Sequence, residues 1–315
     1  MELDQTPVLF LDCQTTGLSA AKAEILELGW SLSTAESIFP RLLKHPDPPS
    51  IPKKIWRMTG LDAAQLEAAT EPAVAWAEVL QAARDAGVVA AVIHYALFEL
   101  PFLRKLHAAP ELPWPVICTY KLARRLHPDL PARTIRALSG HFGLDLPETI
   151  RTEAHVAATR LIWNRFTATL RTQENVRNWD ELQEWLAAPA AKRLPKQPRK
   201  YLTSREMRLD LPKGPGVYEM FSSSGRLLYI GKATSLRDRV NSYFRQRHTK
   251  RARMNELMTQ VGDIRVTQTA TALEAALLEN DRIKDELPPY NAALKSNVGR
   301  ERPLESLERL LNIQK

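Results

Sequence analysis

The sequence predicts an α/β protein with two domains, and three observations support this. Candidate strands and helices alternate between residues 8 and 170, a β-hairpin followed by helices begins near Gly214, and a basic stretch rich in proline, 187–213, lies between them. A chain of 315 residues is also long enough for about two domains with buried cores. We expect a mixed sheet flanked by helices in the first domain and a short antiparallel sheet in the second.

The first domain opens with a short apolar strand, Val8–Leu11, which ends at Asp12. A turn at Thr15–Leu18 and a second, antiparallel strand at Glu24–Leu32 follow. The later pattern predicts a helix at 70–86, a buried strand at 87–94, a helix at 98–108 and a helix at 151–170. A closing helix is expected where Trp179, Leu182, Trp185 and Leu186 recur at helical spacing.

The second domain opens with a hairpin. Gly216–Phe221 and Arg226–Gly231 are its strands, and Ser222–Gly225 supply the turn. A capping-box pattern at Ser235–Asp238 predicts the start of a helix. A helix at 255–261, a strand at 263–269 and a helix at 271–286 follow, and leucine spacing predicts a last helix at 303–311. We place the domains at 1–188 and 204–297, with a linker at 189–203 and a tail at 298–315.

Positive charge is concentrated in the second half of the chain. The net charge is +8, yet residues 1–180 hold 19 Lys and Arg against 20 Asp and Glu, whereas residues 181–315 hold 25 against 16. Such asymmetry favours a polyanionic partner, because lysine and arginine that neutralise phosphates release condensed counterions. A basic surface that serves only solubility is the alternative.

Cysteine content and hydropathy exclude several classes of protein. Cys13 and Cys118 are the only cysteines, without metal-ligand spacing, so we expect reduced, buried thiols and neither a disulfide framework nor a zinc finger. The longest apolar run, Ala86–Ile93, is far shorter than the roughly 18 residues of a membrane span, and the acidic start does not match a secretory signal. We therefore expect a cytoplasmic protein without membrane contact.

A family resemblance covers about residues 5–170. Asp12 with Thr15–Leu18, the segment Ile93–Glu99, and the helix that contains Ala157–Thr159 resemble the DEDDh 3′→5′ exonuclease domain. The resemblance implies a ribonuclease H-like fold. Those exonucleases hold two magnesium ions between carboxylates, which activate water and stabilise the transition state of an in-line displacement.

The residues that carry this chemistry are altered. Asp12 is kept, but the family's glutamate is replaced by Gln14 and its next aspartate by Glu99. His155 stands where a metal-binding aspartate belongs, and Ile150 stands where the general-base histidine belongs. Isoleucine cannot accept a proton from water, so we expect an inactive scaffold. A rearranged one-metal site of Asp12, Glu99 and His155, with 3′→5′ exonuclease activity, is the alternative.

The second domain contains an ordered set of residues, each of which alone has an ordinary structural explanation, such as a packed strand tyrosine or an ion pair of Glu279 with Arg282. Together, Gly216-Val217-Tyr218, Tyr229-Ile230-Gly231-Lys232, Arg239 with Tyr243, Leu278-Glu279-Asn280 and Tyr290-Asn291 closely resemble the GIY-YIG nuclease domain of the UvrC/Cho N-terminal type over about 204–297. Val217 is the one departure, a β-branched replacement for isoleucine.

The resemblance implies a role for each of these residues. Glu279 would bind one Mg²⁺ or Mn²⁺ ion. Tyr218 would take a proton from the attacking water, which requires cations such as Lys232 to lower its pKa. Arg239 would bind the scissile phosphate. Tyr229 and Tyr243 would hydrogen-bond phosphate or water, Asn291 would support the site, and the products would carry a 5′ phosphate and a 3′ hydroxyl.

A basic segment, Arg237–Arg253, adjoins this set and carries seven Lys and Arg against the single acid Asp238. A solvated helix face is the ordinary explanation. Next to a nuclease motif we expect it to hold the DNA backbone. The expected DNA-binding residues are Arg237, Arg245, Arg247, Lys250, Arg251 and Arg253.

The sequence thus predicts a metal-dependent endonuclease of DNA repair that acts on branched, damaged or mismatched duplex. Its first domain would serve substrate selection or recruit a repair partner. UvrC's second nuclease domain and helix-hairpin-helix modules have no counterpart in the sequence, so we expect at most one type of cut. A non-catalytic nucleic-acid adaptor is the alternative, and the sequence does not identify the lesion, the side of the cut, the partner or the oligomeric state.

Overall fold

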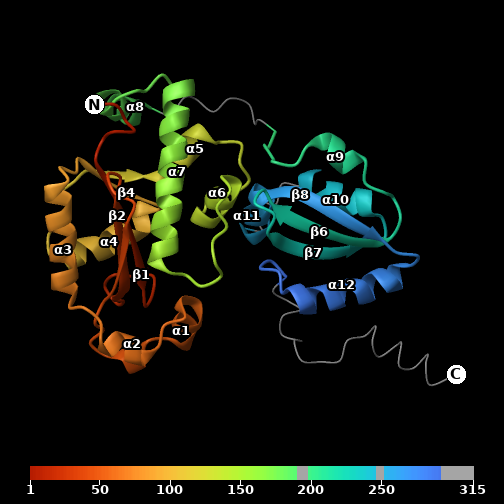
Figure 1. The fold of residues 1–315 in the computed structure, drawn as a ribbon, viewed down its shortest axis with the longest axis horizontal. Coiled ribbons are helices and arrows are strands. Elements are labelled where there is room, and N and C mark those ends of the chain that lie inside the picture. The colour runs from red at the N-terminus through yellow and green to blue at the C-terminus, as the bar shows by residue number, and fades with distance from the viewer. Residues whose placement is uncertain (190–197, 246–251, 292–315) are drawn as a thin grey trace. The chain divides into compact units, whose positions relative to one another are not determined.

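The computed structural model describes residues 1–189, 198–245 and 252–291, which divide into two units (Figure 1). The first unit contains residues 1–128 and 146–197, and the second contains 129–145 and 198–315. The chain therefore passes between the units three times. The sequence pointed to the passage near residue 197, because prolines and basic residues cluster there, but gave no sign of the passages at either end of segment 129–145.

The first unit is built on a mixed five-stranded sheet in the order β3-β2-β1-β4-β5. Only β2 runs antiparallel to its neighbours. The strands are β1 (Val8–Thr15), β2 (Ile25–Leu32), β3 (Ile38–Leu42), β4 (Ala90–Ile93) and β5 (Val116–Cys118). This confirms the expected mixed sheet, and it places Asp12 near the end of the central strand.

Helices cover both faces of this sheet, which explains why the central strands are almost continuously apolar. Leu9 and Leu11 of β1 pack with Trp76 and Leu103, from α3 and α4. The long helix α7 packs along β1, β2 and β3 (Figure 1). The helices of the unit are the 3₁₀ helix η1 (Pro48–Ser50), α1 (Lys53–Thr59), α2 (Ala63–Glu67), α3 (Pro72–Asp85), α4 (Ala96–His107), α5 (Thr119–Leu126), α7 (Thr152–Gln173) and α8 (Trp179–Ala187).

The second unit has a three-stranded antiparallel sheet in the order β7-β6-β8. Tyr218 and Met220 of β6 face the core formed with α10 and α11, while Val217 packs against Ile283 of α12 on the opposite face. Its strands are β6 (Gly216–Ser222), β7 (Leu227–Ala233) and β8 (Val261–Gln268), and its helices are α6 (Ile135–His141), α9 (Arg205–Leu209), α10 (Leu236–Arg245), α11 (Ala252–Gln260) and α12 (Ala272–Glu286).

Most expected elements are present with shifted ends. The first strand continues to Thr15 instead of ending at Asp12, and the strand expected from Gly87 begins at Ala90. The short elements β3, β5, α1, α2, α5, α6 and α9 were not anticipated. Both cysteines are free and buried, as expected. The helix expected at 303–311 lies outside the described residues, and none of the helices within them is long and apolar enough to cross a membrane.

Candidate functional site

Three phenols from three elements of the second unit meet at one place. Tyr218 of β6 is fully buried, and its hydroxyl lies 2.7 Å from the hydroxyl of Tyr243 on α10. The ring centroid of Tyr229, on β7, is 6.1 Å from that of Tyr218. The hairpin and the helix that follows it thus bring together the tyrosines that the sequence singled out.

A glycine makes this arrangement sterically possible. Gly231 lies opposite Tyr218 in the β6–β7 pairing, and a Cβ at that position would lie 2.3 Å from the Tyr218 hydroxyl oxygen and 2.4 Å from its Cζ. Any other residue would force the buried ring to move. The glycine after Tyr229-Ile230 therefore leaves the space that the Tyr218 phenol fills.

Two cations border the phenols in different ways. The Arg239 guanidinium lies 5.1 Å from the centroid of the Tyr243 ring. Burial alone lowers the pKa of Arg239, but the neighbouring phenols raise it by more, so the guanidinium stays charged. Lys232 holds Glu279 instead, because its backbone N–H donates to Glu279 Oε1 at 3.1 Å and its Nζ lies 3.0 Å from Oε2.

Glu279 remains accessible despite these contacts, since 13% of its side chain is exposed. The ion pair with Arg282 that the sequence left open does not form, because Arg282 pairs with Glu219 at 3.0 Å. The Glu279 carboxylate therefore lies at the edge strand β7, where it contacts Lys232.

Asn291 forms two hydrogen bonds with β7, the strand that carries Tyr229. Its Oδ1 accepts the Ile230 N–H at 2.9 Å, and its Nδ2 donates to the Ile230 carbonyl at 2.7 Å, so the buried side-chain amide imitates a strand neighbour. The supporting role that the family resemblance implied for Asn291 stays a prediction, and these hydrogen bonds are compatible with it.

The expected lowering of the Tyr218 pKa is wrong in this structure. Burial raises the pKa of Tyr218 far above its ordinary value, and the adjacent Tyr243 and Tyr229 raise it further. Arg239 opposes this effect without overcoming it. Lys232, expected to help, pairs with Glu279. Burial raises the pKa of Tyr229 as well. Burial therefore favours the neutral form of the Tyr218 phenol, which can donate a hydrogen bond.

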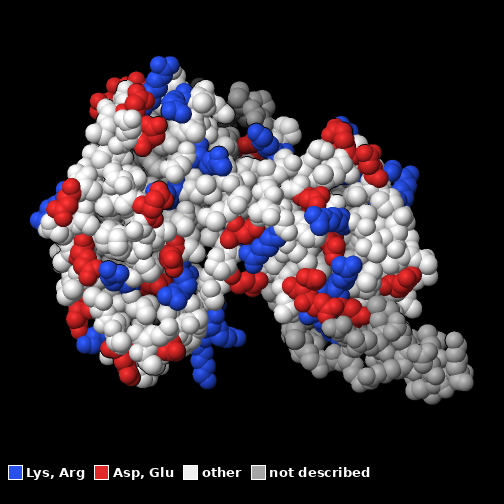
Figure 2. Space-filling view, viewed as in Figure 1, with Lys and Arg blue, Asp and Glu red and all other residues white. Residues whose placement is uncertain are grey.

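The expected DNA-binding cations are only partly placed. Arg245 is exposed at the end of α10, but Arg237 Nε donates to the Leu211 carbonyl at 2.7 Å and Arg253 donates to the Pro289 carbonyl. Arg247, Lys250 and Arg251 lie outside the described residues. On the described part of the face in Figure 2, blue and red side chains are mixed over both units. A continuous basic surface is therefore not evident in this view.

The residues around Glu279 fit a magnesium ion held partly by substrate. Magnesium is commonly bound by one or two carboxylates together with water and phosphate oxygens. Glu279 supplies one such carboxylate at a partly open position. Within the described ranges, no three or more His, Cys, Asp and Glu side chains are arranged to share a metal ion. Any cation here would thus depend on water and phosphate for most of its ligands.

The altered residues of the first unit also meet, but they satisfy one another. Gln14 Nε2 donates to Asp12 Oδ2 at 3.1 Å and lies 3.3 Å from His155 Nδ1. The same His155 nitrogen is 3.2 Å from Asp12 Oδ1. The side-chain amide at position 14 therefore occupies Asp12 with a hydrogen bond, where a second carboxylate would repel it and attract a cation.

Glu99 is buried against the central strand. Its Oε2 accepts the Cys13 N–H at 3.0 Å, and both burial and the nearby Asp12 raise the pKa of its carboxyl well above the ordinary value. The general-base position holds Ile150, whose backbone N–H donates to the Met58 carbonyl at 2.7 Å. The expectation of an inactive scaffold stays a prediction.

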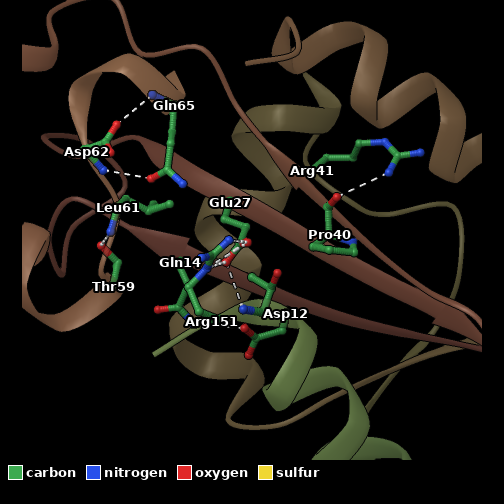
Figure 3. A network of polar contacts seen from close by, with 11 residues as sticks. Asp12, Gln14, Glu27, Pro40, Arg41, Thr59, Leu61, Asp62, Gln65 and Arg151 are labelled. Atoms are coloured by element: carbon green, nitrogen blue, oxygen red, sulfur yellow. Dashed lines mark hydrogen bonds and ion pairs between the residues drawn. The ribbon is translucent and has the colours of Figure 1, made fainter. Parts of the chain in front are cut away.

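A buried ion pair that the sequence did not reveal lies beside these residues (Figure 3). Glu27, 1% exposed, accepts hydrogen bonds from Nε and Nη2 of Arg151 and from the Thr152 N–H. Gly29 permits the approach, since a Cβ there would lie 2.4 Å from Thr152 Cβ. The pair therefore joins the start of α7 to β2.

Two family models match separate parts of the chain. A UvrC-like GIY-YIG domain model matches residues 214–292, and an exonuclease (RNase_T) model matches residues 9–158. A Mycobacterium tuberculosis protein named as a bifunctional exonuclease/endonuclease is 28% identical over 307 residues, 94% of this chain and 46% of that protein. The UvrABC system protein C of Pelodictyon phaeoclathratiforme is 45% identical over 87 residues, 28% of this chain and 14% of that protein. The chain thus spans about half or less of the length of these relatives.

Two solved structures show the same two likenesses. The GIY-YIG N-terminal endonuclease domain of UvrC from Thermotoga maritima, bound to magnesium, is 30% identical, with a TM-score of 0.25, over 28% of this chain and 93% of that chain. Escherichia coli Exonuclease I in complex with a dT13 oligonucleotide is 14% identical, with a TM-score of 0.45, over 69% of this chain and 48% of that chain.

Proposed function

Because the chain carries an exonuclease-family domain at residues 9–158 and a UvrC-like GIY-YIG domain at residues 214–292, we propose that it is a metal-dependent DNA endonuclease of DNA repair. The observation that carries the proposal is the convergence of Tyr218, Tyr229 and Tyr243 in one cluster, with Arg239 beside them and Glu279 at the adjacent sheet edge. Its proposed substrate is branched, damaged or mismatched duplex, following the likeness of residues 214–292 to the UvrC-like domain.

The residues divide the work of phosphodiester hydrolysis. Glu279 would hold the divalent cation, which when bound stabilises negative charge on the phosphate and on the leaving oxygen. Arg239 would bind the scissile phosphate, since a guanidinium can donate to two oxygens at once. Tyr218 is a neutral phenol in the structure, so we assign it to orienting the attacking water by hydrogen bonding. Asn291 would keep the strand of Tyr229 in place.

Metal removal tests this function directly. We expect purified protein with Mg²⁺ to nick a plasmid or a lesion-bearing duplex, EDTA to stop nicking, and excess Mg²⁺ or Mn²⁺ to restore it, because a cation bound through one carboxylate exchanges readily. The products should carry 5′ phosphates and 3′ hydroxyls, which ligase sealing of the nicks would detect. Duplex binding without cleavage under all metal conditions would instead indicate the nucleic-acid adaptor.

For the first unit we propose a binding role without catalysis. Beside the end of β1 an apolar pocket of about 450 Å³ is lined by Leu18, Tyr95, Leu97 and Phe98, among other residues. Leu18 is 89% exposed and Leu97 is 77% exposed, which is unusual for large apolar side chains. Aromatic and aliphatic surfaces of this kind can stack on unpaired bases. The pocket is therefore suited to an exposed base or strand end near a lesion.

An Asp12→Ala variant tests whether this unit retains catalysis. We expect neither wild-type protein nor the variant to shorten a 5′-labelled single strand stepwise, because the Asp12 carboxylate is hydrogen-bonded by Gln14 and Ile150 stands where the general base belongs. The label should stay at full length on a sequencing gel with Mg²⁺ or Mn²⁺. Shortening by the wild type that disappears in Asp12→Ala would instead establish the one-metal exonuclease of Asp12, Glu99 and His155.

A further inference from the structure

Segment 129–145 lies within the part of the sequence that matches the exonuclease family, yet it packs in the unit that holds the phenol cluster. Its helix α6 lies against α11. Gly140 permits close contact, because a Cβ there would lie 2.4 Å from Gln260 Oε1. Farther along, Ser222 at the end of β6 donates to Asp145 at 3.0 Å. The segment therefore contacts the second unit at two places, α11 and the end of β6.

Hydrogen bonds fix α6 on α11 at both of its ends. The Ala132 N–H donates to Thr259 Oγ1 at 2.9 Å, and His141 Nδ1 lies 3.2 Å from the Thr259 carbonyl. Thr134, the N-cap of α6, donates from its hydroxyl to Glu256 Oε2 at 2.6 Å. These contacts are polar and specific, which favours one position of α6 on α11.

The contacts continue from Glu256 to the candidate site. The Tyr290 hydroxyl donates to Glu256 Oε1 at 2.9 Å and accepts from Gln260 Nε2 at 2.7 Å. The Tyr290 N–H in turn donates to the Leu228 carbonyl at 3.1 Å. The next residue is Asn291, which holds both backbone groups of Ile230. Glu256 thus accepts one hydrogen bond from α6 and another from the residue beside Asn291.

We propose that α6 is a positioning arm for the endonuclease site, acting through Glu256 and Tyr290 to hold Asn291 against the strand of Tyr229. The inference rests on the proposed function, since it assigns a catalytic consequence to the arm. Thr134, Glu256 and Tyr290 are positioning residues and touch no substrate. The consequence is that the endonuclease needs a segment which the sequence places inside the other domain.

A double-mutant cycle tests the arm. Thr134→Val breaks the link from α6 to Glu256, and Tyr290→Phe breaks the link from Glu256 to Tyr290, so each cuts the same connection. We expect each to lower kcat on nicked-duplex formation by about tenfold, with KM within about twofold, and the double variant to fall no further than one single variant. Thr134→Val also removes the N-cap of α6. This effect is the same whether residue 290 is Tyr or Phe, so it does not contribute to the interaction energy that the cycle measures.

Three controls separate positioning from general damage. Thr134→Ser keeps the hydroxyl and should restore wild-type kcat. Tyr201→Phe makes the same change at a partly buried tyrosine of the same unit, and should leave kcat near wild type and combine additively with Thr134→Val. Glu256→Gln, which can still bond both neighbours, should be far milder than Glu256→Ala. Effects of Thr134→Val and Tyr290→Phe that simply multiply would overturn the proposal.

Amide hydrogen exchange tests the positioning role of α6 independently of nuclease activity. We expect Thr134→Val to accelerate amide hydrogen exchange at residues 228–231 and 290–291 in the full chain, because those amides lose the restraint that passes through Glu256. If the wild type shows no metal-dependent cleavage, the proposed function fails and exchange alone decides on the arm. Unchanged exchange at 290–291 would refute it whatever the activity.

Discussion

Glu279→Gln is expected to abolish nicking while the protein stays folded. The substitution keeps the size and shape of the side chain, so the hydrogen bond from the Lys232 N–H can persist. It removes the negative charge, which leaves the Lys232 ammonium without its partner and a divalent cation without its carboxylate. We expect kcat/KM to fall by at least about a thousandfold, as measured by initial nicking rates at saturating Mg²⁺.

The matched control lies on the same helix. Glu286 is exposed near the end of α12, and Glu286→Gln makes the same chemical change with the same effect on net charge. It should nick at the wild-type rate and unfold at the wild-type temperature. Comparable activity of Glu279→Gln and Glu286→Gln would show that the carboxylate beside Lys232 is not part of the reaction.

The sequence could predict which of these side chains lie together, because the family pattern is an ordered set of residue types, whereas their roles in a reaction stay a prediction. Tyr218, Tyr229 and Tyr243 meet as expected because strand alternation and helical spacing place them on one face. The partners of each side chain were less predictable. Lys232 was expected to act on Tyr218, but it pairs with Glu279, since pairing across a sheet edge depends on where α12 docks.

The fold shows the same division between local and long-range information. Strands such as β1 and β2, and helix α7, follow from apolar periodicity, which is a local property. The position of α6 could not be inferred, because the residues that hold it, Glu256 and Thr259, are more than a hundred positions away in the sequence. Gly140 was a usable signal in retrospect, as a glycine inside a helix often marks a close approach.

The strongest effect on stability is expected from Arg151→Ala. Glu27 is almost completely buried and makes three hydrogen-bond contacts with Arg151. The variant therefore leaves a carboxylate in the core that keeps its hydrogen bond from the Thr152 N–H but loses its cationic partner. Removing one partner of a buried pair costs about 3–5 kcal/mol. We expect the unfolding transition of the first unit, followed by calorimetry, to shift down by many degrees.

Arg41→Ala provides the comparison, because Arg41 pairs with Glu78 at 2.8 Å where both side chains are about a third exposed. Water can solvate Glu78 when its partner is lost, so this variant should cost at most about 1 kcal/mol. Adding Glu27→Gln to Arg151→Ala should recover part of the loss, since a neutral amide is less costly to bury than an unpaired charge. Equal shifts for Arg151→Ala and Arg41→Ala would contradict this account. A larger shift for Arg151→Ala means that this salt bridge ties the start of α7 to the sheet, and α7 carries His155, which lies beside Asp12.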